Sequence, residues 1–166
     1  ENLDVPVRCH NGEFQSVYEL LLVKGVKPEL FERLEPCITV YGTGKVNLNT
    51  AGPAVLTALA AACGGDGSAS ASLAQKIVDF REGGNVLMTA SAGDIGSRIR
   101  EAVRLTPDEA NLLFSMMPLL ALQSTCFRGI SEGAVGSGGT EGAGGRSRIE
   151  FVFDRTRQSR VFWYEN

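Results

Sequence analysis

The chain has 166 residues, of which 43% are hydrophobic and 21% are charged, and its formal net charge is −3. This length fits one domain or two small ones and is ample for a hydrophobic core. No apolar run approaches the roughly 20 residues of a membrane-spanning helix, so we expect none of these residues to cross a bilayer. The sequence begins at Glu1 without a methionine or a signal-like apolar stretch, which indicates a processed or truncated chain whose membrane anchor would lie upstream.

The N-terminal part is predicted to be irregular over residues 1–12 and helical after that. Ser16 and Glu19 have the spacing of a capping box, in which each side chain satisfies a free amide of the first turn. This pattern predicts a helix that runs through Val23. Gly25 then ends the helix, because glycine adopts the left-handed conformation without steric cost.

A second short helix is predicted over residues 28–34, because proline is tolerated in a first turn. Leu30, Phe31 and Leu34 form its inward face. The two helices must fold back on each other at residues 24–26, where the glycine allows a sharp turn. Two short helices joined at a glycine, with apolar residues on both sides, are typical of a helix-hairpin-helix motif.

The stretch from Asn47 to Pro53 predicts the start of a third helix. Thr50 can accept a hydrogen bond from a free amide of the following turn, and Pro53 suits the first turn. Asn47 and Asn49 are interpreted as turn formers that hold this start by local hydrogen bonds, without a ligand. The predicted structural motif thus consists of six residues: Gly25, Asn47, Asn49, Thr50, Ala51 and Pro53.

Apolar residues continue at helical spacing as far as Cys63, and the glycine pair 64–65 predicts the exit from this helix. The composition of residues 64–70 predicts a flexible link. Another helix follows, with an apolar side between Leu73 and Phe80 and an end at residues 81–84.

Two more helices are predicted before the composition changes. A weaker one covers residues 91–104, around Ile95 and Ile99. Thr106 and Glu109 then form a second capping box, which opens a helix that runs to about Met116.

From Pro118 onward the apolar period changes from 3.6 toward 2, which predicts strands. Ile149, Phe151 and Phe153 alternate on one face of the clearest strand. Three strands are predicted, over residues 119–131, 148–154 and 161–164, with a turn at 155–159. Between the first two strands, Gly133–Gly145 is so rich in glycine that we expect a mobile hairpin loop. Phosphate binding is the alternative for this loop, but it lacks a Gly-Lys-Ser/Thr ending and a following helix.

The cysteines do not predict a metal site. They show no CxxC spacing, and His10 is the only histidine, which argues against a zinc site of the usual kind. Four cysteines allow three disulfide pairings, and their separations do not choose among them. A buried thiol that acts as a small apolar group is an equally good interpretation of Cys63. The disulfide candidates are Cys9, Cys37, Cys63 and Cys126.

No catalytic group stands out. The single histidine lies in the irregular N-terminal segment, and no Gly-x-Ser-x-Gly motif occurs. Asp108 and Glu109 are explained by their place at a helix N-terminus. Three arginines, Arg155, Arg157 and Arg160, are interpreted as a solvated hairpin edge. We therefore expect neither an enzyme nor a small-molecule substrate.

DNA binding is the alternative function. Lys24 and Lys27 flank Gly25, and backbone amides of a hairpin can bind phosphates. The local charge opposes this function, because residues 1–50 carry seven acidic and five basic side chains. We therefore expect no nucleic acid as a partner.

Three ordered segments resemble general secretion pathway protein K, the large minor pseudopilin of bacterial type II secretion. They are Val17–Leu34, Cys37–Tyr41 and Val46–Ala51. The C-terminal part is similar to the closing strands of that family at Ser124–Arg128, Arg148–Arg155 and Val161–Glu165. After Cys63 the chain departs from the family pattern, because a Gly-Asp-Gly-Ser link replaces the second hairpin glycine and its apolar turn.

The resemblance implies an α+β chain with three parts. An irregular segment (1–12) precedes a helical helix-hairpin-helix or SAM-like domain (13–117) and the antiparallel β meander (118–166) of a pilin-like body. It also implies a non-enzymatic subunit at the periplasmic face of the inner membrane, anchored by an N-terminal helix absent from this sequence. The implied partners are the other minor pseudopilins of the pseudopilus tip. Calcium sites are known in the family's pilin body, and Asp154 and Glu132 are unassigned candidate ligands.

Overall fold

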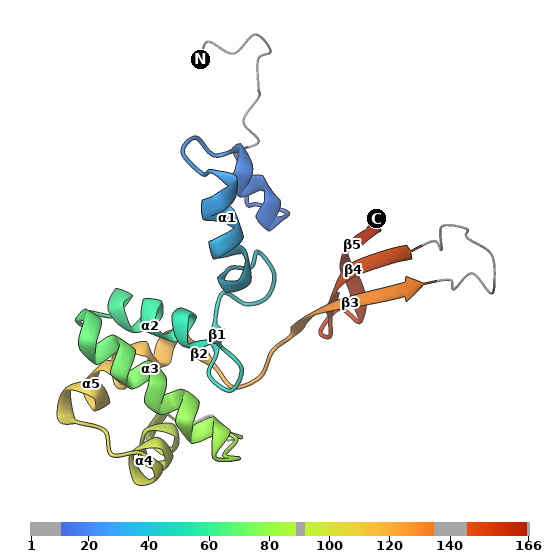
Figure 1. Ribbon diagram of the computed structural model, residues 1–166. Helices are drawn as coiled ribbons and strands as arrows, with labels where there is room; N and C mark the ends of the chain where they lie inside the picture. Colours follow the sequence, from blue (N-terminus) through green and yellow to red (C-terminus); the bar gives the residue numbers. More distant parts are fainter. Residues whose placement is uncertain (1–10, 89–91, 135–145, 166) are drawn as a thin grey trace. The chain divides into compact units, whose positions relative to one another are not determined.

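The computed structural model describes residues 11–88, 92–134 and 146–165, which form helices and strands (Figure 1). The mixed helix and strand composition is as the sequence predicts. The chain divides into two compact units, Glu1–Val40 and Tyr41–Asn166. None of the helices in the described ranges is long and apolar enough to cross a membrane.

The first unit contains the predicted pair of short helices. Ser16 caps a 3₁₀ helix, Val17–Leu22, and the reciprocal capping box with Glu19 is present. The helix α1 follows at Pro28–Leu34 and continues into a 3₁₀ turn. Gly25 has φ of +97°, so the left-handed turn between the two helices is confirmed. The first helix is 3₁₀ rather than α, as is common in helices of only six residues.

The second unit begins its regular structure with a pair of short parallel strands, β1 (Val46–Asn47) and β2 (Leu120–Ala121). The predicted strand over residues 119–131 is therefore wrong. The chain forms β2 and then bends, and β3 starts only at Cys126. Hydrogen bonds explain the break, because the carbonyl of Leu122 and the hydroxyl of Ser124 bind side chains from outside the sheet.

Four α-helices lie between β1 and β2 in the sequence. They are α2 (Pro53–Ala62), α3 (Gly67–Glu82), α4 (Ala92–Ala102) and α5 (Pro107–Met116). The predicted flexible link over residues 64–70 is wrong, because α3 already begins at Gly67. Asp66 caps it: its Oδ1 accepts a hydrogen bond from the amide of Ala69 at 2.6 Å.

The short connection between α2 and α3 depends on two glycines. Gly64 has φ of +100°, as the predicted helix exit requires. A Cβ atom on Gly65 would collide with the hydroxyl of Ser70 and lie 2.7 Å from Cδ2 of Leu112. Glycine at position 65 therefore allows α2 and α3 to pack closely against each other and against α5.

The core of the second unit lies among these helices. Fifteen buried apolar residues form it: Leu48, Leu56, Ala60, Leu73, Ala74, Ile77, Val78, Phe80, Leu87, Ile95, Ile99, Leu112, Leu113, Met116 and Leu120. Every helix from α2 to α5 contributes, and so do the segments that flank β1 and β2. The apolar residues predicted for α2, α3 and α4 thus meet in one cluster, to which α5 adds Leu112, Leu113 and Met116.

The C-terminal part forms an antiparallel sheet of three strands in the order β3-β4-β5. Their bounds are Cys126–Ala134, Arg146–Asp154 and Ser159–Glu165. The predicted turn after Asp154 is present, with Gln158 at φ of +50°. The predicted glycine-rich loop starts within β3 at Gly133, and residues 135–145 lie outside the described residues.

An ion pair joins α3 to the start of α5. Lys76 Nζ lies 2.7 Å from Glu109 Oε2, and the Glu109 carboxylate also accepts hydrogen bonds from Ser72 Oγ and the amide of Thr106. Glu109 is only 3% exposed. Burial alone would raise the pKa of Glu109, but these hydrogen bonds outweigh it and lower the pKa to about 2.

Acid should therefore remove stability that Glu109 provides. The pKa falls from 4.5 to about 2 on folding, which corresponds to about 3 kcal/mol of stability that is fully present above about pH 5 and is lost as the pH falls toward 2. Urea unfolding at a series of pH values between 7 and 2.5 measures this loss of stability. In Glu109→Gln the pH dependence should shrink by most of that amount, whereas the exposed Glu101→Gln control should keep it. Parallel profiles for all three proteins would contradict the assignment.

Candidate functional site

Asn49 makes long-range hydrogen bonds at the centre of the predicted motif. Its Nδ2 donates to the carbonyls of Leu87 and Leu122, each at 2.9 Å. Its Oδ1 accepts a hydrogen bond from the amide of Leu87 at 3.0 Å. The sequence predicted a local turn former here, but the partners lie 38 and 73 residues away. Asn49 therefore ties the start of α2 to the segment after α3 and to the segment after β2.

Asn47 has both a local and a long-range role. Its Oδ1 accepts a hydrogen bond from the amide of Asn49 at 3.0 Å, which is the turn contact that the sequence predicted. Its Nδ2 donates to Ser124 Oγ at 2.8 Å. The backbone carbonyl of Asn47 also accepts from the amides of Thr50 and Ala51. Asn47 thus closes the turn and also fixes the segment that leads into β3.

Arg81 also binds the segment around Asn49. The sequence predicted only that Arg81 lies at the end of a helix. Its Nη1 donates to the carbonyl of Leu48 at 3.0 Å and to that of Ala51 at 2.8 Å. These carbonyls belong to irregular backbone, and Leu48 is fully buried. Without Arg81 they would lack a partner within the described residues, which would cost stability.

The predicted helix cap at Thr50 is wrong. The N-cap of α2 is Gly52, without a side-chain hydrogen bond, and Thr50 is exposed. Pro53 occupies the first turn of α2 as predicted. The asparagines and Arg81 hold the chain in place before the helix, so a side-chain cap is not needed to fix where α2 begins.

One face of the three-stranded sheet carries large apolar side chains, none of which is fully buried. The register places five large side chains on it: Phe127, Ile149, Phe151, Phe153 and Trp163. None of the five is buried, and Phe127 and Trp163 are 47% and 46% exposed. The sheet's one buried side chain, Val152, lies on the opposite face. We call the set of five the apolar sheet face.

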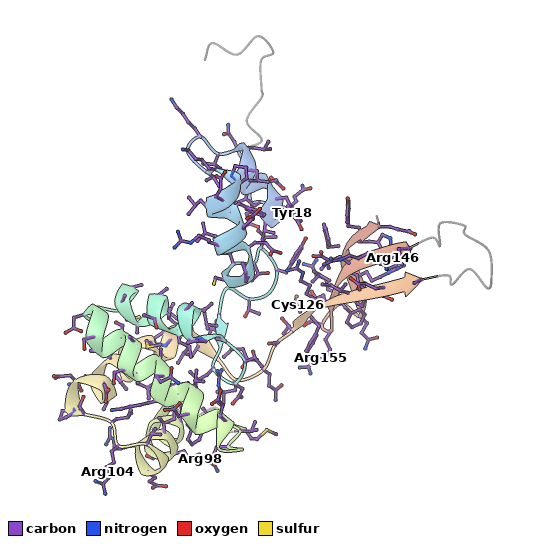
Figure 2. All side chains as sticks on the ribbon, viewed as in Figure 1. Tyr18, Arg98, Arg104, Cys126, Arg146 and Arg155 are labelled. Atoms are coloured by element: carbon purple, nitrogen blue, oxygen red, sulfur yellow. The ribbon has the colours of Figure 1, made fainter. Side chains whose placement is uncertain are left out.

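Aromatic contacts order this face. The ring of Phe151 lies over Gly129, where a Cβ atom would collide with it. Phe151 also stacks on Trp163, with ring centroids 6.4 Å apart. The guanidinium of Arg160 lies 4.6 Å from the ring centroid of Trp163. The guanidinium of Arg155 lies 6.0 Å from the ring centroid of Phe127. Arg155 and Arg160, two of the three arginines predicted at the hairpin edge, therefore border the apolar sheet face, and Figure 2 shows Arg155 beside the strands.

The first unit also exposes apolar side chains. Among its described residues only Phe31 is buried, and Tyr18 packs on it at a ring-centroid distance of 5.5 Å (Figure 2). Seven large apolar residues are exposed: Phe14, Tyr18, Leu21, Leu22, Val23, Leu30 and Leu34. Leu30 and Leu34 were predicted to point inward with Phe31. Two short helices leave these side chains without a core to enter.

The remaining predicted residues do not come together in a site. Cys37, Cys63 and Cys126 are free thiols, and Cys9 and His10 lie outside the described residues. The disulfide prediction thus has no bonded pair among the three described cysteines.

The two candidate calcium ligands lie at opposite ends of the sheet. Glu132 pairs with Arg148, and Asp154 pairs with Cys126 six residues further along β4, a separation of about 20 Å. One oxygen of Asp154 already accepts hydrogen bonds from the amides of Thr156 and Arg157. The described residues contain no group of three His, Cys, Asp or Glu side chains that could hold a metal ion. Asp154 and Glu132 therefore do not fit a shared calcium site.

Replacing Asn49 should destabilise the second unit. Asn49→Ala would leave one amide and two carbonyls of irregular backbone without partners, at a cost of about 2 to 4 kcal/mol in the free energy of unfolding. Thr50→Ala, one residue further on but exposed, is the matched control and should change it by less than about 0.5 kcal/mol. Urea denaturation measures both values. Equal effects would show that Asn49 is only a turn former.

Comparison with known protein families gives a match in the N-terminal part of the chain. A family model for type II secretion system protein K matches residues 1–43, which include the helix pair of the first unit. No curated protein and no solved structure matches the chain. Over its first 43 residues, the chain is similar to protein K of the type II secretion system.

Proposed function

We propose that the chain is the periplasmic part of a minor pseudopilin, a non-enzymatic assembly subunit of the type II secretion system. The family match over residues 1–43 carries this proposal. A pseudopilin acts through contacts with other subunits, so its functional surfaces should be apolar and exposed rather than enclosed pockets. The partners would be the other minor pseudopilins of the tip, at the periplasmic face of the inner membrane.

The finer fold assignment belongs to the same proposal. The glycine turn at Gly25 and the close pair of α2 and α3 support two helix-hairpin-helix motifs, the second with an Asp66 cap in its turn. The antiparallel sheet supports the closing part of a pilin-type body. In this assignment the sheet, rather than the helices, supplies the surface that packs on a neighbouring subunit.

The apolar sheet face is the proposed contact surface. Five large apolar side chains on one face, none of them buried, are unfavourable in water and favour a partner. Arginines at its border supply polar groups for the rim of an interface. Nothing in the comparison or in the described residues favours the DNA-binding alternative.

Association with the other tip subunits tests the proposal. The protein, extended upstream of Glu1 to its anchor-proximal helix, should form a complex with the other minor pseudopilins of its own secretion system in size-exclusion chromatography and titration calorimetry. Trp163→Ala and Phe127→Ser should each weaken binding about tenfold or more, because exposed aromatic residues dominate interface energies.

Tyr164→Ser is the matched control for the surface. Tyr164 is 56% exposed and neighbours Trp163 on the same strand, but its side chain lies on the opposite face. Its replacement should leave binding within about twofold. Equal losses for all three variants would reject the apolar sheet face as the contact. Absence of any complex with the unaltered protein would reject the pseudopilin proposal.

A further inference from the structure

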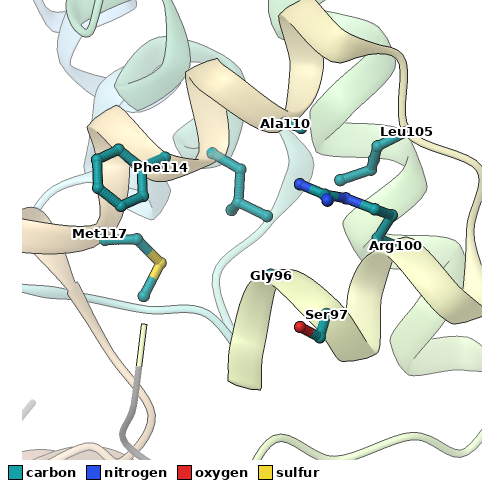
Figure 3. A pocket seen from close by; sticks show the side chains of 8 residues that line it. Gly96, Ser97, Arg100, Leu105, Ala110, Phe114 and Met117 are labelled. Carbon is teal, nitrogen blue, oxygen red and sulfur yellow. The ribbon is translucent and has the colours of Figure 1, made fainter. Parts of the chain in front are cut away.

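The helices and the sheet of the second unit offer different kinds of surface. A groove of about 240 Å³ lies between α4 and α5, where Gly96, Leu113 and Phe114 line it (Figure 3). These two helices carry both acidic and basic residues, so the charge of the groove selects no class of ligand. The sheet differs, because one of its edges is complementary in charge to a second copy of itself.

Strand β3 forms an outer edge of the three-stranded sheet (Figure 1). In the order β3-β4-β5, β4 pairs with one side of β3, and no strand of the described residues pairs with its other side. The outer side of such a strand offers a row of backbone N–H and C=O groups to another strand. The register of β3 with β4 is unbroken over the nine residues from Cys126 to Ala134. The outer edge of β3 is therefore regular enough to take a further strand.

The edge formed by β5 is less suited to such pairing. The register of β4 with β5 shifts between Val152 and Phe153, so Val161 is an extra residue on β5. A bulge of this kind bends the strand and interrupts the hydrogen-bonding pattern that a partner strand needs. Strand β3 has no such shift, so the regular edge of this sheet is that of β3.

The charges of β3 are complementary to those of a second β3. Arg128 and Glu132 lie two residues on either side of Ile130, on the sheet face opposite the apolar sheet face. If a second copy of β3 runs antiparallel with Ile130 opposite Ile130, the two-fold axis places Arg128 of each chain opposite Glu132 of the other. Unlike charges that lie directly opposite each other stabilise a strand pair, whereas like charges oppose it.

The other charges of this face agree with the same register. Six charged residues of β3 and β4 lie on it, three of each sign: Arg128, Glu132, Arg146, Arg148, Glu150 and Asp154. Within one chain, Arg128 Nε lies 2.7 Å from Glu150 Oε1, and Arg148 Nη1 lies 3.8 Å from Glu132 Oε1. In the dimer each Glu132 would therefore lie between Arg148 of its own chain and Arg128 of the other. The charges then alternate in sign across the four central strands.

The uncharged residues of β3 fit this register as well. Ile130 is 49% exposed, and at the two-fold axis the Ile130 side chain of the second copy would cover it. On the apolar sheet face, Phe127 would lie opposite Gly133 of the other chain, and a glycine leaves room for the aromatic ring. Gly129 would lie opposite Ser131, which is also small. The apolar sheet faces of the two copies would then be continuous.

We propose that the outer edge of β3 pairs with β3 of a second copy of this chain. The pairing joins two three-stranded sheets into one sheet of six strands, with Ile130 at its centre and the pair Arg128–Glu132 formed twice. The same edge of both copies is used, so the assembly closes as a dimer and does not grow into a fibre. This inference goes beyond the proposed function, because it uses the edge of the sheet and leaves the apolar sheet face free for other subunits.

Sedimentation velocity of the purified chain tests the dimer. Pairing of two nine-residue strands forms a small interface, so we expect a weak dimer with a Kd of about 10 to 500 μM at pH 7. Ile130→Lys should raise this Kd about tenfold or more, because two lysines would meet at the two-fold axis. Tyr164→Lys is the matched control: it adds the same charge to the same face, but on β5. It should change the Kd by less than about twofold.

A charge swap tests the register. Arg128→Glu alone and Glu132→Arg alone each place like charges opposite each other at two points of the dimer, so each should raise the Kd about tenfold or more. An equimolar mixture of these two variants should dimerise again, because both pairs between the unlike chains then have opposite charges. Ile130→Lys remains decisive if a charge-reversed variant fails to fold.

Three results would overturn the proposal: a chain that stays monomeric up to about 1 mM, a dimer unaffected by Ile130→Lys, or a mixture that associates no better than its components. A dimer that is lost in Trp163→Ala but kept in Ile130→Lys would also overturn it, because the apolar sheet face would then be the site of self-association. None of these results decides whether the chain associates with the other tip subunits.

Discussion

The hydrogen bonds of the Asn49 side chain are the constraint on which the second unit depends. One amide group satisfies the amide and the carbonyl of Leu87 and the carbonyl of Leu122. These groups belong to irregular backbone at the edge of the apolar core, where an unpaired polar group would cost about 1 to 3 kcal/mol. A leucine or an alanine at position 49 could not form these three hydrogen bonds. The segment Asn47–Ala51 therefore holds three distant parts of the chain together.

Arg81 and Asn47 extend this constraint in two directions. Arg81, in the last turn of α3, binds two carbonyls of the same segment, so the end of α3 and the start of α2 are fixed together. Asn47 binds Ser124, so the chain leaves β2 in a bend rather than as a continuous strand. As a result, β3 begins a separate sheet whose apolar face is not used by the helical core. An exposed apolar face is what a subunit needs for docking to a neighbour.

Local patterns predicted most of the elements, because their causes lie within a few residues. The capping boxes at Ser16 and Thr106 and the left-handed glycines at positions 25 and 64 each act within one turn. The cap at Asp66 also acts within one turn, but it was not predicted, because the surrounding glycines and serines are typical of a flexible link. The strand break after Ala121 could not be predicted in this way, because its cause is an asparagine more than seventy residues earlier. The pairing of Lys76 with Glu109 and the contacts of Arg81 could not be predicted from local patterns either, because their partners are distant in the sequence.

Native-state hydrogen exchange at the Leu87 amide tests the central claim most directly. This amide lies in a loop, and its hydrogen-bond acceptor is Asn49 Oδ1. If the Asn49 contacts hold the second unit together, Leu87 should exchange only by global unfolding, with an opening free energy within about 1 kcal/mol of that of the buried Ile77 in α3. Exchange at a free energy several kcal/mol lower, as in a fraying loop, would contradict the account.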